Sequence, residues 1–133
     1  MLRTALVAAL TIAFAGHLPA APSAAATDAY GHTAAADRTL RSGCHDYHYR
    51  YVVKAPTNDW TLETFLIDPR GDRVGSGSFS AESDPPRGRP AFRLCRYATR
   101  PGRFAIRAKL IWYDGSEAHP VRFEVTRFRL RRS

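Results

Sequence analysis

Two histidines flank an aspartate in this sequence, and such a group can bind a metal ion. His45 and His48 lie on either side of Asp46, and imidazole with carboxylate is a common ligand set for zinc. On a β-strand, however, side chains three residues apart point to opposite faces of the sheet, so these two rings do not converge on one ion. We therefore predict polar surface residues here and no bound metal.

Aspartates beside prolines and glycines form a second group with ligand chemistry. Asp68, Asp72 and Asp84 would supply the carboxylate oxygens that calcium prefers in turns. Their spacing is not that of an EF-hand loop, and aspartates in turns commonly accept hydrogen bonds from nearby backbone amides. The sequence thus predicts a structural role for these residues, and we expect no cofactor.

Nucleophilic catalysis is the third chemistry to consider. Residues 75–78 read Gly-Ser-Gly-Ser, but a nucleophile elbow needs a strand that turns directly into a helix, and no helix is predicted here. With no catalytic motif, the sequence predicts a protein that is not an enzyme. A Ser-His-Asp cluster formed only in the folded chain would instead indicate a small secreted hydrolase.

The first 26 residues have the pattern of a secretory signal peptide. Arg3 precedes an apolar run over residues 5–16, and the alanines at 24–26 form an A-x-A cleavage site. We predict cleavage after Ala26 and a secreted product. The apolar run is much shorter than the ~20 residues that a membrane-spanning helix needs, and no later segment approaches that length, so no transmembrane segment is predicted.

Cys44 and Cys95 are the two cysteines of the chain. In an oxidising compartment an even number of cysteines indicates a disulfide, and with two residues the pairing is forced. Both cysteines alternate in step with polar residues, which places the predicted bridge at the periphery of a sheet. This differs from the central disulfide of immunoglobulin domains.

Apolar residues recur at every second position from residue 47 onward, which is typical of strands with one buried face. Short turn segments rich in proline and glycine separate the apolar runs. Six strands without a helix predict an all-β fold, an antiparallel β-sandwich of six or seven strands with immunoglobulin-like or jelly-roll-like topology, or else an open barrel. The predicted strands cover residues 47–53, 62–67, 74–79, 92–95, 104–113 and 121–130.

Three details of these strands can be predicted. Glycines at 75 and 77 indicate an edge strand or a bulge. Phe128 lies out of step with Val125, so a one-residue bulge near residues 126–127 would return it to the core. The inward residues of the longest strand are expected to be Phe104, Ile106, Ala108, Leu110 and Trp112.

The predicted domain organisation has three parts. The signal peptide covers residues 1–26, a flexible lead-in with little apolar periodicity covers 27–42, and a single β-sandwich domain covers 43–133. Ordered structure is expected to begin near Gly43. The 107 residues left after cleavage are enough for one domain and too few for two.

Two resemblances support this fold. Residues 60–74 (WTLETFLIDPRGDRV) and 100–108 (RPGRFAIRA) resemble the hairpins of immunoglobulin-like and pre-peptidase C-terminal sandwich modules. Residues 92–104 (FRLCRYATRPGRF), 111–115 (IWYDG) and 127–130 (RFRL) are similar to small uncharacterised exported proteins of actinobacteria. The resemblance implies a fold and a compartment, and it implies no active site.

The formal net charge of +8 favours anionic partners. Arginines make up 18 of the 20 basic residues, a bias that GC-rich coding also produces, so a merely solvated basic surface is the alternative. Outward positions of two predicted strands combine cations with large apolar side chains, a composition enriched at interfaces. This candidate binding face consists of Arg93, Tyr97, Arg107, Lys109, Ile111 and Tyr113. Coverage of Ile111 and Tyr113 by other parts of the chain is the alternative.

Taken alone, the sequence predicts a secreted, non-catalytic binding module. Its expected partner is an extracellular protein or an anionic envelope polymer. No nucleic-acid-binding motif is present, so no nucleic acid is expected. Trp60, beside a turn, is a candidate platform for a sugar ring. Besides the hydrolase, an inhibitor of secreted proteases is an alternative, with residues 84–90 as its inhibitory loop.

Overall fold

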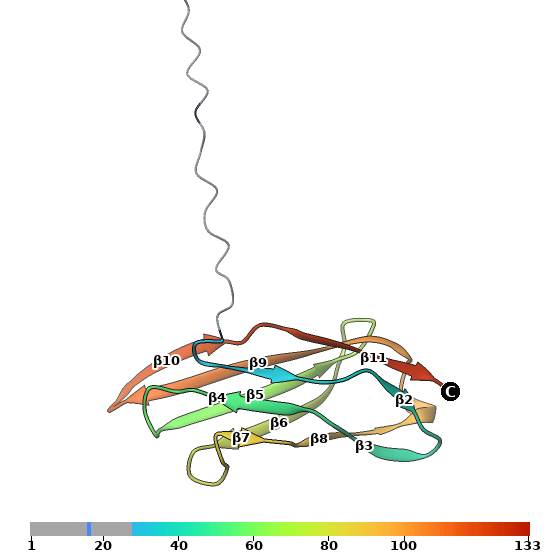
Figure 1. Ribbon diagram of the computed structural model, residues 1–133, viewed down its shortest axis with the longest axis horizontal. Coiled ribbons are helices and arrows are strands. Elements are labelled where there is room, and N and C mark those ends of the chain that lie inside the picture. The colour runs from blue at the N-terminus through green and yellow to red at the C-terminus, as the bar shows by residue number, and fades with distance from the viewer. Residues whose placement is uncertain (1–15, 17–27) are drawn as a thin grey trace, which may run out of the picture.

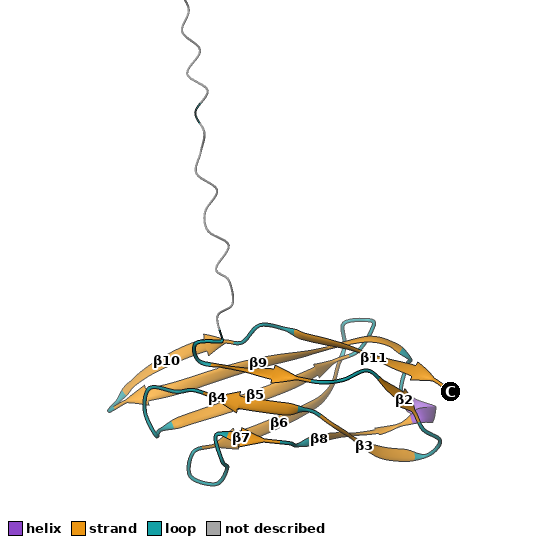
Figure 2. Ribbon diagram, in the orientation of Figure 1, coloured by secondary structure: helices purple, strands orange, loops and turns teal. Residues whose placement is uncertain are grey.

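The computed structural model describes Gly16 and residues 28–133, and residues 28–133 form two facing layers of β-strands (Figure 1). Apart from Gly16, the predicted signal peptide lies outside the described residues, so its cleavage stays a prediction. No helix in the described part of the chain is long and apolar enough to cross a membrane. The strands are β1 (Gly31–Ala34), β2 (Arg38–Leu40), β3 (Cys44–His48), β4 (Arg50–Val53), β5 (Trp60–Ile67), β6 (Arg73–Ser80), β7 (Arg87–Gly88), β8 (Ala91–Cys95), β9 (Gly102–Asp114), β10 (Glu117–Arg122) and β11 (Thr126–Arg132), with one 3-10 turn, η1 (Arg96–Ala98) (Figure 2).

The first layer is a six-stranded sheet with the order β2-β11-β9-β5-β6, in which β10 also pairs with β9. The 13-residue strand β9 is its spine. It pairs with β5 along one side, and with β10 and β11 in succession along the other. All pairings in this layer are antiparallel except that of β2 with β11.

The second layer consists of two short sheets, β1-β4-β7 and β3-β8. The chain passes from β3 to β4 through Tyr49, and from β7 to β8 through Arg89 and Pro90. The amide of Tyr49 donates a hydrogen bond to the carbonyl of Pro90 at 3.0 Å. Proline has no amide proton to return a bond, so the pairing is interrupted at this point and the layer is divided in two.

The core lies between the layers, and the predicted alternation is confirmed. Tyr47, Tyr49, Tyr51 and Val53 are buried and face the six-stranded sheet. Of the five inward residues predicted in β9, four are buried and Trp112 is half-buried. Alternate residues of β5 complete the core, which establishes the antiparallel β-sandwich.

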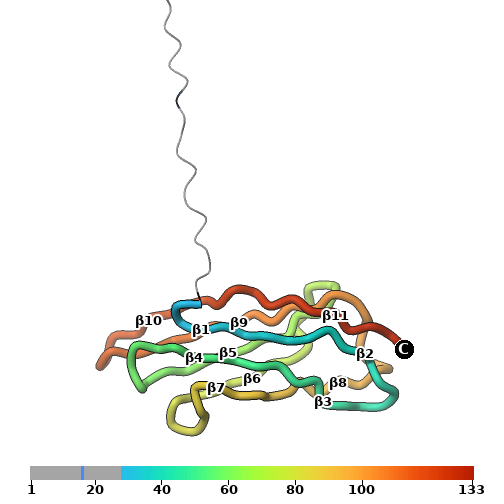
Figure 3. The backbone as a smooth tube through the Cα atoms, viewed as in Figure 1, coloured from blue at the N-terminus to red at the C-terminus, as the bar shows by residue number. Residues whose placement is uncertain are grey.

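The predicted starting point of ordered structure, near Gly43, is wrong. Strands β1 and β2 both lie within the segment 27–42, which was expected to be a flexible lead-in. Strand β1 pairs with β4, then the chain changes layers and β2 pairs with β11 (Figure 3). Leu40 is fully buried. A strand of three or four residues with one or two inward side chains is too short to produce a periodic apolar pattern.

The segment 84–90, predicted to be loop, also needs a correction because Arg87 and Gly88 form β7 and pair with β4. The described residues contain eleven strands and not six or seven. Three of them, β1, β2 and β7, were not predicted. In addition, the predicted strands 47–53 and 121–130 are each divided in two.

The predicted bulge in the last strand is present at a slightly different place. Arg122 pairs with Lys109, whereas Thr126 pairs with Ile106, so four steps along one strand match three along β9. The extra residue therefore lies in the segment 123–125 and not at 126–127. It has the predicted effect, since Phe128 is buried.

Strand β6 lies at a sheet edge, as its glycines predicted. The structure adds the physical reason. A Cβ atom on Gly77 would lie 2.8 Å from both the Thr64 Oγ1 and the Tyr49 hydroxyl, and one on Gly75 would lie 2.9 Å from the Phe92 ring. The glycines thus allow β6 to close over the stacked rings of Tyr49 and Phe92, whose centroids are 4.4 Å apart.

Candidate binding surfaces

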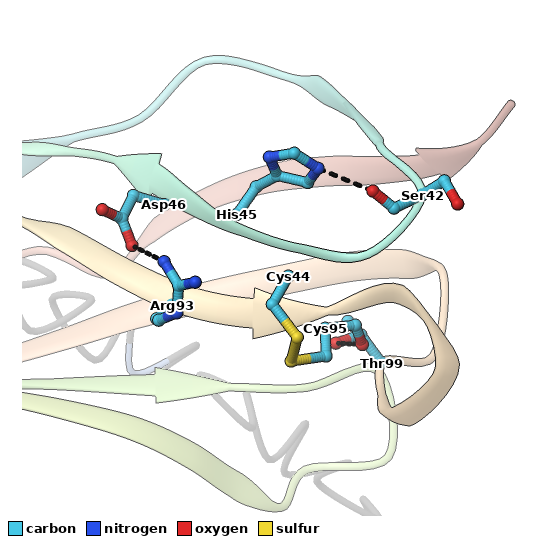
Figure 4. Close-up of a disulfide and its surroundings, with 7 residues drawn as sticks. All are labelled: Ser42, Cys44, His45, Asp46, Arg93, Cys95 and Thr99. Atoms are coloured by element: carbon cyan, nitrogen blue, oxygen red, sulfur yellow. Dashed lines mark hydrogen bonds and ion pairs between the residues drawn. A yellow bond between two sulfur atoms is a disulfide. The ribbon is translucent and has the colours of Figure 1, made fainter.

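The disulfide between Cys44 and Cys95 is present, and it joins directly opposite residues of β3 and β8 (Figure 4). The two Cα atoms are 3.9 Å apart, and both residues are half-buried. The bridge lies at the end of the two-stranded sheet, as the polar alternation predicted. Next to it, the Thr99 hydroxyl donates to the Cys95 carbonyl at 2.8 Å. The disulfide therefore closes one end of the second layer.

The side chains singled out as metal ligands make local contacts. His45 Nε2 lies 2.6 Å from the carbonyl oxygen of Ser42, and His48 Nδ1 lies 3.4 Å from that of Arg89. Asp68 Oδ1 accepts hydrogen bonds from two amides of its own turn, those of residues 70 and 72. Asp84 accepts one from the amide of Ser80. Among residues 28–133 and Gly16, no three histidine, cysteine or acidic side chains are grouped so that they could hold a metal ion.

The contacts of the histidine rings also bear on whether one of them could act as a catalytic base. The His119 ring stacks on Trp112 with centroids 4.0 Å apart, and its Nε2 lies 3.9 Å from the Glu117 carboxylate. The contacts of His45 and His48 are to backbone carbonyls. These rings are thus engaged with groups other than a serine hydroxyl, whose proton a hydrolase must remove.

Trp60 is not a platform for a sugar ring. Its side chain belongs to the core, and only 5% of the residue is exposed. The prediction was wrong because the apparent turn residue is the first residue of β5, where it points inward and packs with Leu62 and Leu110. A stacking platform must be exposed to its ligand.

The structure divides the predicted binding face between two surfaces. Arg93 points outward from β8 in the second layer, where it forms an exposed ion pair with Asp46 at 3.2 Å. Tyr97 lies in η1 and is 87% exposed. The other four residues, Arg107, Lys109, Ile111 and Tyr113, lie on the outer side of β9 in the first layer. The inner sides of β8 and β9 meet in one core, so their outer sides face opposite directions.

Cross-strand pairing surrounds the four β9 residues with further cations. Lys109 lies between Glu63 on β5 and Arg122 on β10, and Arg107 lies opposite Phe65. The Arg73 guanidinium carbon lies 4.0 Å above the centre of the Phe65 ring, in a cation–π arrangement. We call this outer side of the six-stranded sheet the cationic face. Its basic residues are Arg73, Arg103, Arg107, Lys109, Arg122, Arg127, Arg129 and Arg131.

Acidic residues are scarce on the cationic face. Among the outward positions of its strands, Glu63 is the one carboxylate. Beside the strands, Asp37 contacts Arg129 and Arg131 of β11, and the exposed Glu124 lies between β10 and β11. Half-buried Phe65 and Ile111 supply apolar area between the cations. Directly paired strands are about 5 Å apart and alternate residues along a strand about 7 Å apart. The face therefore presents a two-dimensional array of positive charge.

Alternation along single strands indicated which residues of β9 point outward, but it could not indicate which strands are neighbours. Phe65, Arg73 and Arg122 were missed for that reason. Alternation along their own strands could have indicated that these side chains point outward. Their position beside Arg107 and Lys109 follows only from the pairing of β9 with β5, β10 and β11.

No protein-family model matches the chain, and no curated protein matches it in sequence. Among solved structures, the CARDB domain of a protein from Pyrococcus furiosus, solved in complex with di-metal ions, is similar to it with a TM-score of 0.38 and 9% identity. The match covers 80% of this chain and 96% of that one. At this TM-score nothing about the function of this chain follows from the likeness.

Proposed function

We propose that this protein is a secreted, non-catalytic β-sandwich module that binds anionic polymers of the cell envelope through its cationic face. The observation behind this proposal is the pairing pattern of β9, which sets Arg107 and Lys109 among cations from β6, β10 and β11 with one opposing carboxylate. Arginine forks bind oxyanions in bidentate fashion. A linear polymer with repeated anionic groups can contact several such cations at once.

The shape of the surface also favours a polymer. The cationic face is the outer side of an extended sheet, and its positive charges are spread along several strands. A flat array of charge holds one small anion weakly, because exposed pairs are screened by salt. When one polymer chain makes many such contacts, each contact holds the next anionic group at a high effective concentration, so the weak contacts add.

The two alternative functions have less structural support. A hydrolase would need a nucleophile with an adjacent base. The rings of His45, His48 and His119 are engaged elsewhere, and in the described part of the chain the buried Nδ1 of His32 has no hydrogen-bond partner, serine included. An inhibitor would need a loop with its backbone available to a protease. In the segment 84–90, the Pro86 carbonyl accepts from the Val53 amide at 2.7 Å, and the Pro85 carbonyl accepts from the Tyr51 hydroxyl at 2.8 Å.

Binding to immobilised long-chain polyphosphate over a series of salt concentrations tests the proposal. The double variant Arg107→Ala/Arg122→Ala should bind at least tenfold more weakly and depend less on salt. The matched control is Arg87→Ala/Arg93→Ala, which removes the same charge from the second layer and should change binding less than twofold. An equal loss in both variants would show diffuse charge attraction and overturn the proposal, as would unchanged binding in the first variant.

A further inference from the structure

A second surface feature lies where the second layer meets β2, the edge strand of the first, at two interruptions of the strands. The chain leaves β1 at residue 34 and begins β2 at residue 38, and nearby β3 passes into β4 at Tyr49. Between these interruptions lies a hollow of about 320 Å³. This volume equals roughly ten water molecules at liquid density, enough for a small ligand with some of its hydration.

Basic residues from separate elements line this hollow. They are Arg38 at the start of β2, His48 at the end of β3, Arg50 at the start of β4 and Arg89 between β7 and β8. The rest of the lining is the alanine run 34–36 and Tyr49. Alanines leave space that longer side chains would fill. We call this site the arginine hollow.

No carboxylate lines the arginine hollow, and the acids closest to it in sequence are engaged elsewhere. Asp37 accepts a hydrogen bond from the Arg129 amide at 2.8 Å and lies 3.5 Å from the Arg131 guanidinium. Asp46 pairs with Arg93 at 3.2 Å. Within the described part of the chain, Arg38, Arg50 and Arg89 form no ion pair.

Arg38, Arg50 and Arg89 bring three positive charges to one hollow with no carboxylate in its lining, and a bound anion would offset the repulsion between them. Guanidinium forks match the geometry of tetrahedral oxyanions and bind them through paired hydrogen bonds. We propose that the arginine hollow is a binding site for a phosphoryl or sulfuryl group. None of the basic residues that define the cationic face lines the hollow, so this site does not depend on polymer binding there.

Calorimetric titration of the secreted protein with inorganic phosphate, sulfate and glycerol 3-phosphate, at ionic strength held constant with sodium chloride, tests this site. We expect saturable binding of one anion per chain. Stronger binding of the inorganic ions would identify a free anion as the ligand, and stronger binding of glycerol 3-phosphate would identify an ester group on a larger molecule. A signal that never saturates, equal to that of chloride, would overturn the proposal.

The variant Arg50→Gln/Arg89→Gln should lose at least tenfold in affinity for the anion. All three arginines are exposed, so the variant is expected to fold, and its thermal unfolding checks this. The control Arg87→Gln/Arg93→Gln changes two exposed arginines of the same layer outside the hollow and should bind normally. Normal binding by the first variant would contradict the site. Polyphosphate binding by Arg107→Ala/Arg122→Ala tests the cationic face separately, because that variant leaves the arginine hollow unchanged.

Discussion

The two layers of the sandwich achieve cohesion by different means. In the first layer, β9 pairs with β5 over eight residue positions and with β10 over six. In the second layer the pairings are shorter, five positions for β3 with β8, four for β1 with β4 and two for β4 with β7, and Pro90 separates β7 from β8. Backbone ladders are therefore longer in the first layer, and the second layer depends more on side-chain contacts.

Tyrosine hydroxyls supply much of that side-chain cohesion. Tyr47 accepts from the Arg41 amide at 3.0 Å, Tyr49 bonds Thr64 on β5 at 2.7 Å, and Tyr51 donates to the Pro85 carbonyl at 2.8 Å. Each hydroxyl thus attaches the second layer to a different segment. A layer of short strands can therefore be stable where tyrosine rings fill the core and their hydroxyl groups reach hydrogen-bond partners.

The largest expected effect is the loss of the disulfide from the second layer. The Cys44→Ser/Cys95→Ser variant should lose about 4 kcal/mol of unfolding free energy on the chain-entropy model, because the bridge joins residues 51 apart in sequence. Urea unfolding measures this loss.

Hydrogen exchange of the same variant sharpens the comparison of the layers. Amides of β3 and β8 should lose protection before those of β5 and β9, since only the first pair depends on the bridge. A uniform loss of protection through both layers would contradict the different origins of their cohesion. Cys44→Ala/Cys95→Ala serves as the control for effects of the introduced hydroxyls.

The next effect concerns the contact between the layers. Gly77→Ala places a methyl group 2.8 Å from both oxygens of the Tyr49–Thr64 hydrogen bond, which must move apart. We expect a loss of about 2–3 kcal/mol in unfolding free energy, typical of an overpacked core. The matched control is Ser78→Ala on the outer side of the same strand, which should change stability by less than about 0.5 kcal/mol. Equal effects of both substitutions would show that β6 does not close tightly over the second layer.

The parts of the fold that the sequence predicted are those with one buried face over several residues. The alternation of Tyr47 to Val53 and of Phe104 to Leu110 follows directly from the strand period, since each inward side chain is apolar. Strands β1, β2 and β7 have two to four residues and are held by pairing with distant segments. Such pairing has no local signal.

The candidate sites were less predictable than the fold for the same reason. Alternation along the strand predicted that Arg107 and Lys109 point outward. The position of Arg122 beside them follows only from the pairing of β9 with β10. Arg93 was also predicted to point outward, and it does. It faces the opposite direction because its strand, β8, belongs to the other layer. The arginine hollow combines residues from β2, β4 and the β7–β8 connection, and no periodicity along the chain brings those together.

The smallest expected effect is that of Tyr49→Phe, and it depends on pH. Removing the hydroxyl leaves that of Thr64, which is fully buried, without its side-chain partner, so we expect a loss of about 1–2 kcal/mol at neutral pH. Burial raises the pKa of Tyr49 above its ordinary value of 10.0, and it also raises that of Tyr51. The matched control is Tyr97→Phe. The ring of Tyr97 is exposed, so this substitution should leave stability unchanged.

The sign of the pH dependence follows from proton binding. A phenol with a raised pKa in the native state keeps its proton at a pH where the unfolded chain has begun to lose it. Its contribution to stability is therefore complete below about pH 10 and is lost as the pH rises through the native pKa. Urea unfolding between pH 8 and 11 should show a shallower decline for Tyr49→Phe than for the native chain, with Tyr51 responsible for the part that remains. An unchanged slope would mean that the Tyr49 hydroxyl is solvated in the native state, and the second layer would then depend on its disulfide more than on its tyrosines.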